Sequence, residues 1–185
     1  MALSGSSWVD QFPTSRSVDD LQEPFRSNVQ GFLKAIIQSG ASLRIADTLR
    51  PPQRVYLMHW SFAIANATIN PAKVPLMTGV DIQWVHTDPT GNPDFVASRS
   101  AASDMVKGYG IVFAPALKSR HSDGLAIDMT ISWQDNLSII DAAGSTQTIQ
   151  SEPRNGLNSD LHRIGASYGV VKLVTDPPHW SSDGH

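Results

Sequence analysis

Residues 119–131 read SRHSDGLAIDMTI and place a histidine in a polar turn and a carboxylate within an apolar strand pattern. Residues 125–131 alternate in the manner of a half-buried strand, and Asp128 lies among their apolar side chains. An ionised carboxylate in such surroundings needs a counter-charge, which a divalent cation can supply. Gly124 permits a sharp turn between His121 and the strand. This stretch therefore predicts a metal site that includes His121 and Asp128.

A second histidine, His179, follows the apolar strand pattern of residues 170–174. Three protein ligands would leave the fourth position of a zinc ion open, as catalytic zinc sites require. Asp176 precedes His179 by three residues, and the two prolines between them favour polyproline II, in which such residues point the same way. We therefore expect Asp176 to act as a general base beside the metal, and Trp180 to line the site.

The composition excludes several other kinds of site and partner. The 185 residues include no cysteine, which excludes disulfides, a thiolate nucleophile and cysteine-based zinc sites. A formal net charge of -3 and the lack of a Lys/Arg run argue against a nucleic-acid partner. No apolar run is long enough for a membrane span. The first residues lack the features of a secretory signal, which predicts synthesis in the cytoplasm without Sec export.

We expect an α+β fold, in which the N-terminal helices pack on one side of a small antiparallel sheet and the zinc lies in a cleft at the edge or end of the sheet. The expected helices are 17–39, Pro51 to Ala65, a segment within 98–107, and 158–168, and the expected strands are 43–46, 125–131, 137–140, 146–149 and 170–174. Arg50 lies at a strand-to-helix corner. Residues 1–16 are expected to be loose and 17–185 to form a single catalytic domain, within which residues 68–118 give no clear strand.

Two motifs resemble those of a known zinc peptidase family. The first is S-x-H-x-x-G-x-A-x-D, formed by Ser119, His121, Gly124, Ala126 and Asp128, and the second is the pair His179-Trp180. The family comprises D-alanyl-D-alanine carboxypeptidases and dipeptidases and phage L-alanyl-D-glutamate endopeptidases. The resemblance implies that His121, Asp128 and His179 bind Zn²⁺. It also implies that Asp176 is the base, at a position that is commonly Glu, and that Arg50 binds substrate or steadies the oxyanion. Ser119, two residues from a ligand, is a further candidate for substrate contact.

What the resemblance implies about function is hydrolysis of an amide in the peptide stem of peptidoglycan, with the L-Ala–D-Glu bond as the expected target. A single domain without an export signal is similar to a phage or prophage endolysin, a bacteriolytic enzyme that reaches the cell wall in the periplasm after the membrane is opened. We expect a monomer with peptidoglycan as its partner. Two alternatives stay open: a D-alanyl-D-alanine carboxypeptidase or dipeptidase, and a non-catalytic wall-binding module stabilised by zinc.

Overall fold

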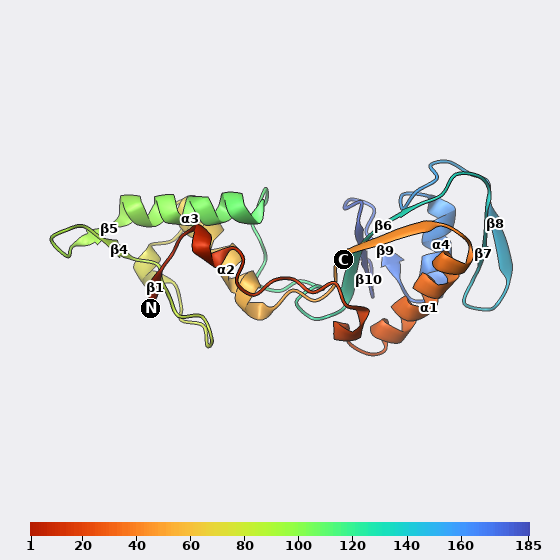
Figure 1. The fold of residues 1–185 in the computed structure, drawn as a ribbon, viewed down its shortest axis with the longest axis horizontal. Helices are drawn as coiled ribbons and strands as arrows, with labels where there is room; N and C mark the ends of the chain where they lie inside the picture. The colour runs from red at the N-terminus through yellow and green to blue at the C-terminus, as the bar shows by residue number, and fades with distance from the viewer. The chain divides into compact units, whose positions relative to one another are not determined.

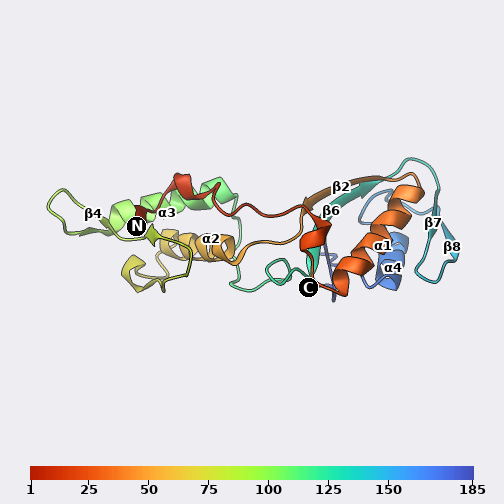
Figure 2. The same ribbon diagram turned by 60° about the horizontal axis from the view of Figure 1, so that its bottom comes forward.

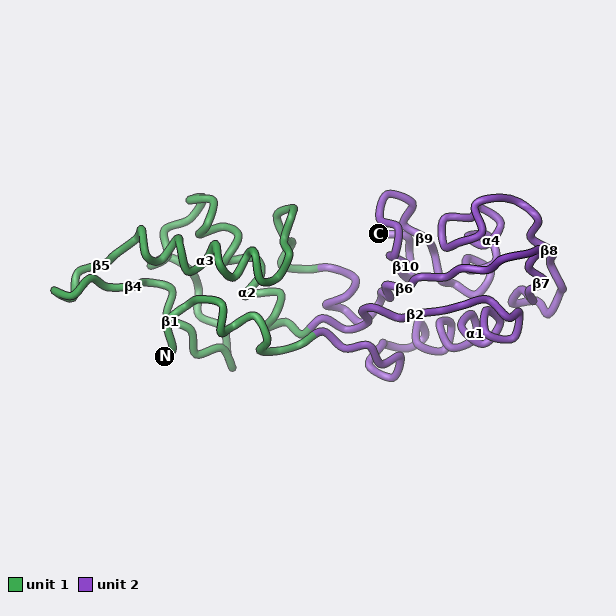
Figure 3. The backbone as a smooth tube through the Cα atoms, turned by 45° about the horizontal axis from the view of Figure 1, so that its top comes forward, with its two compact units in different colours: residues 1–13, 51–118 green, residues 14–50, 119–185 purple.

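The computed structural model describes residues 1–185 and shows an α+β protein with four α-helices and small sheets (Figure 1). The chain forms two compact units (Figure 3): unit 1 comprises residues 1–13 and 51–118, and unit 2 comprises residues 14–50 and 119–185. The domain expected over residues 17–185 therefore includes parts of both units. None of the helices combines the length and the apolar character needed to cross a membrane.

Unit 2 is built on a four-stranded antiparallel sheet with the strand order β2-β6-β10-β9. Its strands are β2 (Ser42–Asp47), β6 (Ala126–Ser132), β9 (Val171–Lys172) and β10 (His179–Ser181). A separate hairpin pairs β7 (Leu137–Ile140) with β8 (Thr146–Ile149), as the sequence predicts. Strand β10 was not predicted, because three residues are too few to show an alternating pattern.

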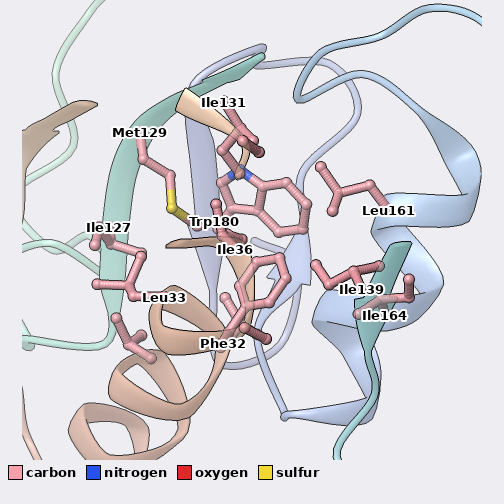
Figure 4. Close-up of a cluster of buried hydrophobic side chains, with 14 of the residues drawn as sticks. Phe32, Leu33, Ile36, Ile127, Met129, Ile131, Ile139, Leu161, Ile164 and Trp180 are labelled. Atoms are coloured by element: carbon pink, nitrogen blue, oxygen red, sulfur yellow. The ribbon is translucent and has the colours of Figure 1, made fainter. Parts of the chain in front are cut away.

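Two helices of unit 2, α1 (Phe25–Gln38) and α4 (Ser159–Ser167), lie next to each other in Figure 2. Both pack on the face of the sheet that carries the apolar side chains of β6, and they share one core with it. Figure 4 shows this core around Trp180, with Phe32, Leu33, Ile36, Ile127, Met129, Ile131, Ile139, Leu161 and Ile164. The opposite face of β6 and β10 is left free for polar side chains.

The start of α1 differs from the helix predicted over residues 17–39. A 3₁₀ turn at Val18–Asp20 comes first, and the α-helix begins only at Phe25, after Pro24. Proline has no N–H to donate and its ring clashes with the preceding turn, so a helix does not run through it. The predicted cap Ser17 does accept a hydrogen bond from the Asp19 N–H at 3.2 Å, but it caps the 3₁₀ turn.

Unit 1 has its own core, formed where α2 (Pro52–Ala65) packs against α3 (Phe95–Tyr109). Its strands are two residues long: β1 (Ala2–Leu3) pairs with β3 (Ile82–Gln83), and β4 (His86–Thr87) pairs with β5 (Pro93–Asp94). Residues 1–16 contrast with the expected loose segment. Besides β1, they contain Trp8, whose buried side chain belongs to this core and whose Nε1 donates to the Leu3 carbonyl at 3.0 Å.

Candidate metal centre

Because side chains alternate along strand β6, Asp128 points away from the core. Ile127, Met129 and Ile131 point into the core, so Asp128 and Thr130 point to the opposite face. The carboxylate that the sequence placed among apolar neighbours therefore lies on the polar face of a strand whose other face is buried.

His179 reaches the same face through the register of β10. Its Cα is paired with that of Asp128, and residues directly opposite one another in an antiparallel pair have side chains on the same side of the sheet. The following residue, Trp180, is paired with Ile127 and points into the core. A shift of the register by one residue would turn Trp180 toward the face of Asp128 and His179 toward the core.

His121 enters from the turn that precedes β6. Gly124, with φ +67°, closes this turn by donating to the His121 carbonyl at 3.3 Å. The backbone here is left-handed, and a Cβ added to Gly124 would lie only 3.3 Å from the Gln22 main-chain nitrogen, so glycine is the residue that fits. The turn thus brings the His121 ring beside the strand residue Asp128.

Three donor atoms from these residues form a nearly equilateral triangle. The His121 Nε2, the His179 Nδ1 and one oxygen of Asp128 are each 3.1 Å from the other two. Nitrogen and oxygen ligands about 2.0–2.1 Å from a tetrahedral zinc ion stand about 3.3 Å apart. The cluster therefore has the spacing and donor chemistry of a metal-binding site, and the residues expected as ligands from the sequence are brought together.

Both imidazole rings are oriented by hydrogen bonds at their other nitrogen. Nδ1 of His121 lies 2.7 Å from the Thr48 carbonyl, and Nε2 of His179 lies 3.1 Å from the main-chain oxygen of His185. An acceptor at one nitrogen places the proton there and leaves the lone pair of the other nitrogen directed into the cluster. This is the outer arrangement that metal-ligating histidines usually have.

Charge within the cluster favours an ionised carboxylate. Burial alone would raise the pKa of Asp128, but when the two imidazole rings are protonated, the hydrogen bonds and positive charge of His121 and His179 outweigh burial and hold the pKa well below its usual range. Burial lowers the pKa of His179, whereas the hydrogen bond and charge of Asp128 and the His185 oxygen raise it, with a net increase. The three side chains thus form a buried site that stabilises positive charge beside a carboxylate.

A second set of contacts fixes the segment after β10. The Ser181 hydroxyl accepts from the N–H groups of Gly184 and His185, at 2.9 and 3.0 Å, and so positions the oxygen that faces His179. The Arg120 guanidinium makes a bidentate ion pair with Asp183. Because Arg120 precedes a candidate ligand, this pair ties the turn of His121 to the segment that orients His179.

The main chain of Arg50 lies beside the cluster. Its N–H donates to the His121 carbonyl at 3.0 Å, two residues after Thr48, whose carbonyl faces the His121 ring. The guanidinium is half-buried and lies 3.7 Å from the carboxylate of Asp47, which pairs with Asp128 in the sheet. The structure therefore brings the predicted substrate-binding arginine next to the candidate ligands.

Asp176 lies in the turn that leads into β10, but the backbone is not polyproline II as expected. The His179 N–H donates to the Asp176 carbonyl at 3.0 Å, which closes a four-residue turn around the two prolines. A turn of this kind keeps its first and last residues close, and the charge of Asp176 contributes to raising the pKa of His179. The Asp176 side chain is exposed and makes no hydrogen bond of its own.

The buried ammonium of Lys172 holds this turn from inside. It donates to three carbonyls, those of Leu173, Asp176 and His179. Burial lowers the pKa of Lys172, an effect that the charges of Asp176 and Asp128 oppose. Lys172 was not predicted as part of the site, although a lysine inside the apolar run of residues 170–174 is a signal that could have indicated it. The main-chain oxygens of Thr48 and His185 have no such signal in the sequence.

The two remaining candidates, Trp180 and Ser119, make contacts that support the fold. Trp180 is 0% exposed and lies in the core, so it does not line the metal face, contrary to the expectation; successive strand residues point to opposite faces. The Ser119 main chain and side chain exchange hydrogen bonds with Ser122, which shapes the turn before His121.

Comparison of the sequence with protein-family models gave no match, and no match was found among curated proteins.

Proposed function

We propose that this chain is a zinc-dependent peptidase that hydrolyses an amide of the peptidoglycan stem. The observation that carries the proposal is the triangle of His121, Asp128 and His179 donor atoms, with each histidine oriented by a main-chain oxygen. Two imidazoles and one carboxylate are a donor set found in catalytic zinc sites, which keep one position open.

Zinc would supply Lewis acidity at this site, which polarises an amide carbonyl and lowers the pKa of water. Asp176 is the chain's own proton carrier in this proposal, because its exposed carboxylate lies in the turn that ends at His179. It would take a proton from the attacking water and deliver it to the leaving amine. Lys172 supports this role indirectly by fixing the carbonyls of the same turn.

Arg50 is the proposed anchor for a substrate carboxylate. Its guanidinium has only a distant partner in Asp47, at 3.7 Å, and a planar guanidinium can pair with a carboxylate through two parallel hydrogen bonds. The D-Glu residue of the stem has such a carboxylate. The resemblance of the two motifs to the peptidase family, with Asp in the position of the base as in some phage members, favours the L-Ala–D-Glu bond and an endolysin-like role.

A digest of purified sacculi, followed by mass spectrometry of the released fragments, tests the proposal. The expected result is a new D-Glu amino terminus, lost on chelation and restored by added zinc. Release of free D-Ala alone would replace the endopeptidase by a carboxypeptidase. Bound zinc without cleavage of any muropeptide would overturn the enzymatic proposal and favour a zinc-stabilised binding module.

A further inference from the structure

Strand β8 of unit 2 has one free edge, because β7 is its only neighbour in the hairpin (Figure 2). At the turn of this hairpin, the Asp141 N–H donates to the Ser145 carbonyl at 3.0 Å, so the main chain of Asp141 faces across the hairpin. Main-chain groups of successive strand residues point to alternate sides, so those of Thr146 and Thr148 point outward. The free edge therefore offers the N–H and carbonyl groups of these two residues.

No part of the chain covers this edge. The outward groups of Thr146 and Thr148 have no hydrogen-bond partner, and both residues are exposed. On β7, by contrast, the outward carbonyl of Ile140 accepts from the Tyr168 hydroxyl at 2.9 Å. Proteins usually protect a free edge with a lysine, a proline or a bulge, and residues 145–151, STQTIQS, have none of these. An edge of this kind can add a strand from a bound peptide.

A groove of about 320 Å³ lies between this edge and helix α4. Its lining residues are Asp141, Gln147, Thr148, Ile149, Asp160, Arg163, Ile164 and Ser167. Ile149 shares the core with Ile164 of α4, so Thr148, the residue before it, has its side chain on the opposite side and contributes its main chain to the groove. Asp160 and Ser167 are about 10 Å apart along the helix, the length of about three residues of an extended strand. The groove therefore fits a short extended peptide.

Charge in the groove favours a basic peptide. Asp160 forms an ion pair with Arg163, so these two charges offset each other. Asp141 has no basic partner: Oδ1 accepts from the Ser145 N–H at 2.9 Å, and Oδ2 accepts from the Gln147 amide at 3.0 Å. These hydrogen bonds hold the pKa of Asp141 below its usual range, so the carboxylate is ionised at neutral pH. The groove thus has one uncompensated negative charge, at Asp141.

We propose that the groove between β8 and α4 binds an extended, basic segment of a partner protein, which adds a strand to β8. Main-chain groups of the segment pair with Thr146 and Thr148, and a lysine or arginine side chain pairs with Asp141. The D residues of a peptidoglycan stem would interrupt such a ladder, so the occupant is a protein segment rather than the proposed substrate. This inference goes beyond the proposed peptidase function and does not depend on it.

NMR titration of the ¹⁵N-labelled protein with a capped peptide tests the site. The probe is acetyl-Thr-Val-Lys-Val-Thr amide, and the matched control peptide has glutamate in place of lysine. We expect the amide signals of Thr146 and Thr148 to shift at millimolar probe, because their N–H groups gain acceptors. The glutamate peptide is expected to bind roughly tenfold more weakly, since attraction to Asp141 is replaced by repulsion of similar size.

Two substitutions separate the contributions of main chain and charge. Thr148→Pro removes an outward N–H and keeps the hydrogen bonds to β7, and it is expected to weaken probe binding roughly tenfold. Ser138→Pro is the matched control, because Ser138 is the exposed partner of Thr148 on β7, and it should bind like the wild type. Asp141→Asn should weaken binding of the lysine peptide about two- to fivefold and remove its advantage over the glutamate peptide.

Circular dichroism confirms that each variant is folded, and the comparison of the two peptides on the wild type needs no variant. Unshifted signals of Thr146 and Thr148, equal binding of the lysine and glutamate peptides, or full affinity in folded Thr148→Pro would overturn the proposal. If the same signals shift with protein concentration alone and sedimentation shows a dimer, the edge pairs with a second copy of the chain, and the proposal of a basic partner segment fails.

Discussion

At the scale of single residues, the candidate metal centre combines side chains from three local settings. His121 comes from a turn, Asp128 from the middle of a strand, and His179 from the first residue of another strand. In each histidine one nitrogen is engaged by a main-chain oxygen, so the ring has one orientation and one free lone pair. The geometry therefore depends on backbone positions as much as on the ligands themselves.

Removal of any one ligand is expected to abolish zinc binding. Wild-type protein should hold about one zinc ion per chain, and His121→Ala, Asp128→Ala and His179→Ala should each hold less than about a tenth of that, because two remaining protein ligands make a weak site. Metal analysis after dialysis measures this, with circular dichroism to confirm folding. His59→Ala in unit 1 is the control and should keep its zinc. Retention of zinc by all three variants would contradict the assignment.

Asp176→Asn is expected to keep the zinc and lose activity by roughly 10²- to 10⁴-fold, the usual contribution of a positioned general base. The amide has nearly the same shape but cannot accept the proton. Asp176→Glu should recover part of the activity. The exposed Asp135 provides the control, since Asp135→Asn removes the same charge outside the cluster. Loss of zinc in Asp176→Asn would show instead that Asp176 is a ligand or a structural residue.

At the scale of secondary structure elements, close packing of α4 against β10 sets the position of the strand that carries His179. Gly165 of α4 lies where an added Cβ would be 2.7 Å from the Trp180 ring and 2.8 Å from the Val170 carbonyl oxygen. Real Cβ atoms do not approach so closely, so the glycine is required for this contact. The Trp180 ring also packs 5.4 Å from the Phe32 ring of α1, centre to centre.

Gly165→Ala is therefore expected to destabilise the protein by about 1–3 kcal/mol, the usual effect of overpacking a core. Urea unfolding followed by circular dichroism measures it. Gly156→Ala is a matched control, because its nearest neighbour is 4.0 Å away and its stability should be unchanged. A Gly165→Ala variant as stable as the wild type would mean that α4 moves away from Trp180 at little cost.

At the scale of the whole molecule, the three candidate ligands all belong to unit 2, and each unit has a core of its own. Unit 2 is assembled from two stretches of sequence, 14–50 and 119–185, and the intervening residues 51–118 all belong to unit 1. A ligand that binds only the folded form of a unit stabilises that unit.

Chelation of zinc is therefore expected to affect unit 2 selectively. Free zinc at a concentration of 100 times its Kd would stabilise unit 2 by about 2.7 kcal/mol. This corresponds to roughly 100-fold slower hydrogen exchange for amides that exchange only when the unit unfolds. Hydrogen exchange with mass spectrometry should show faster exchange in peptides of β6 and β10 after chelation, and no change in peptides of α2 and α3. Equal acceleration in both units would contradict this, and added zinc should reverse the effect.

Much of the local structure was predictable from the sequence, because it depends on short-range patterns. The alternation around Asp128 predicted β6, the turn signals predicted the β7–β8 hairpin, and the two prolines predicted the start of α2. The grouping of His121, Asp128 and His179 was also expected, from the chemistry of an apolar strand with a carboxylate and from the motifs.

Other features were decided only by the tertiary structure. The register between β10 and β6 places His179 beside Asp128 and buries Trp180, and a strand of three residues has no pattern that could predict it. The division into two units and the contact of the His121 ring with the Thr48 carbonyl likewise arise from contacts between segments far apart in sequence. Side-chain identity determines which residues can bind a metal, whereas long-range backbone pairing determines which of them meet.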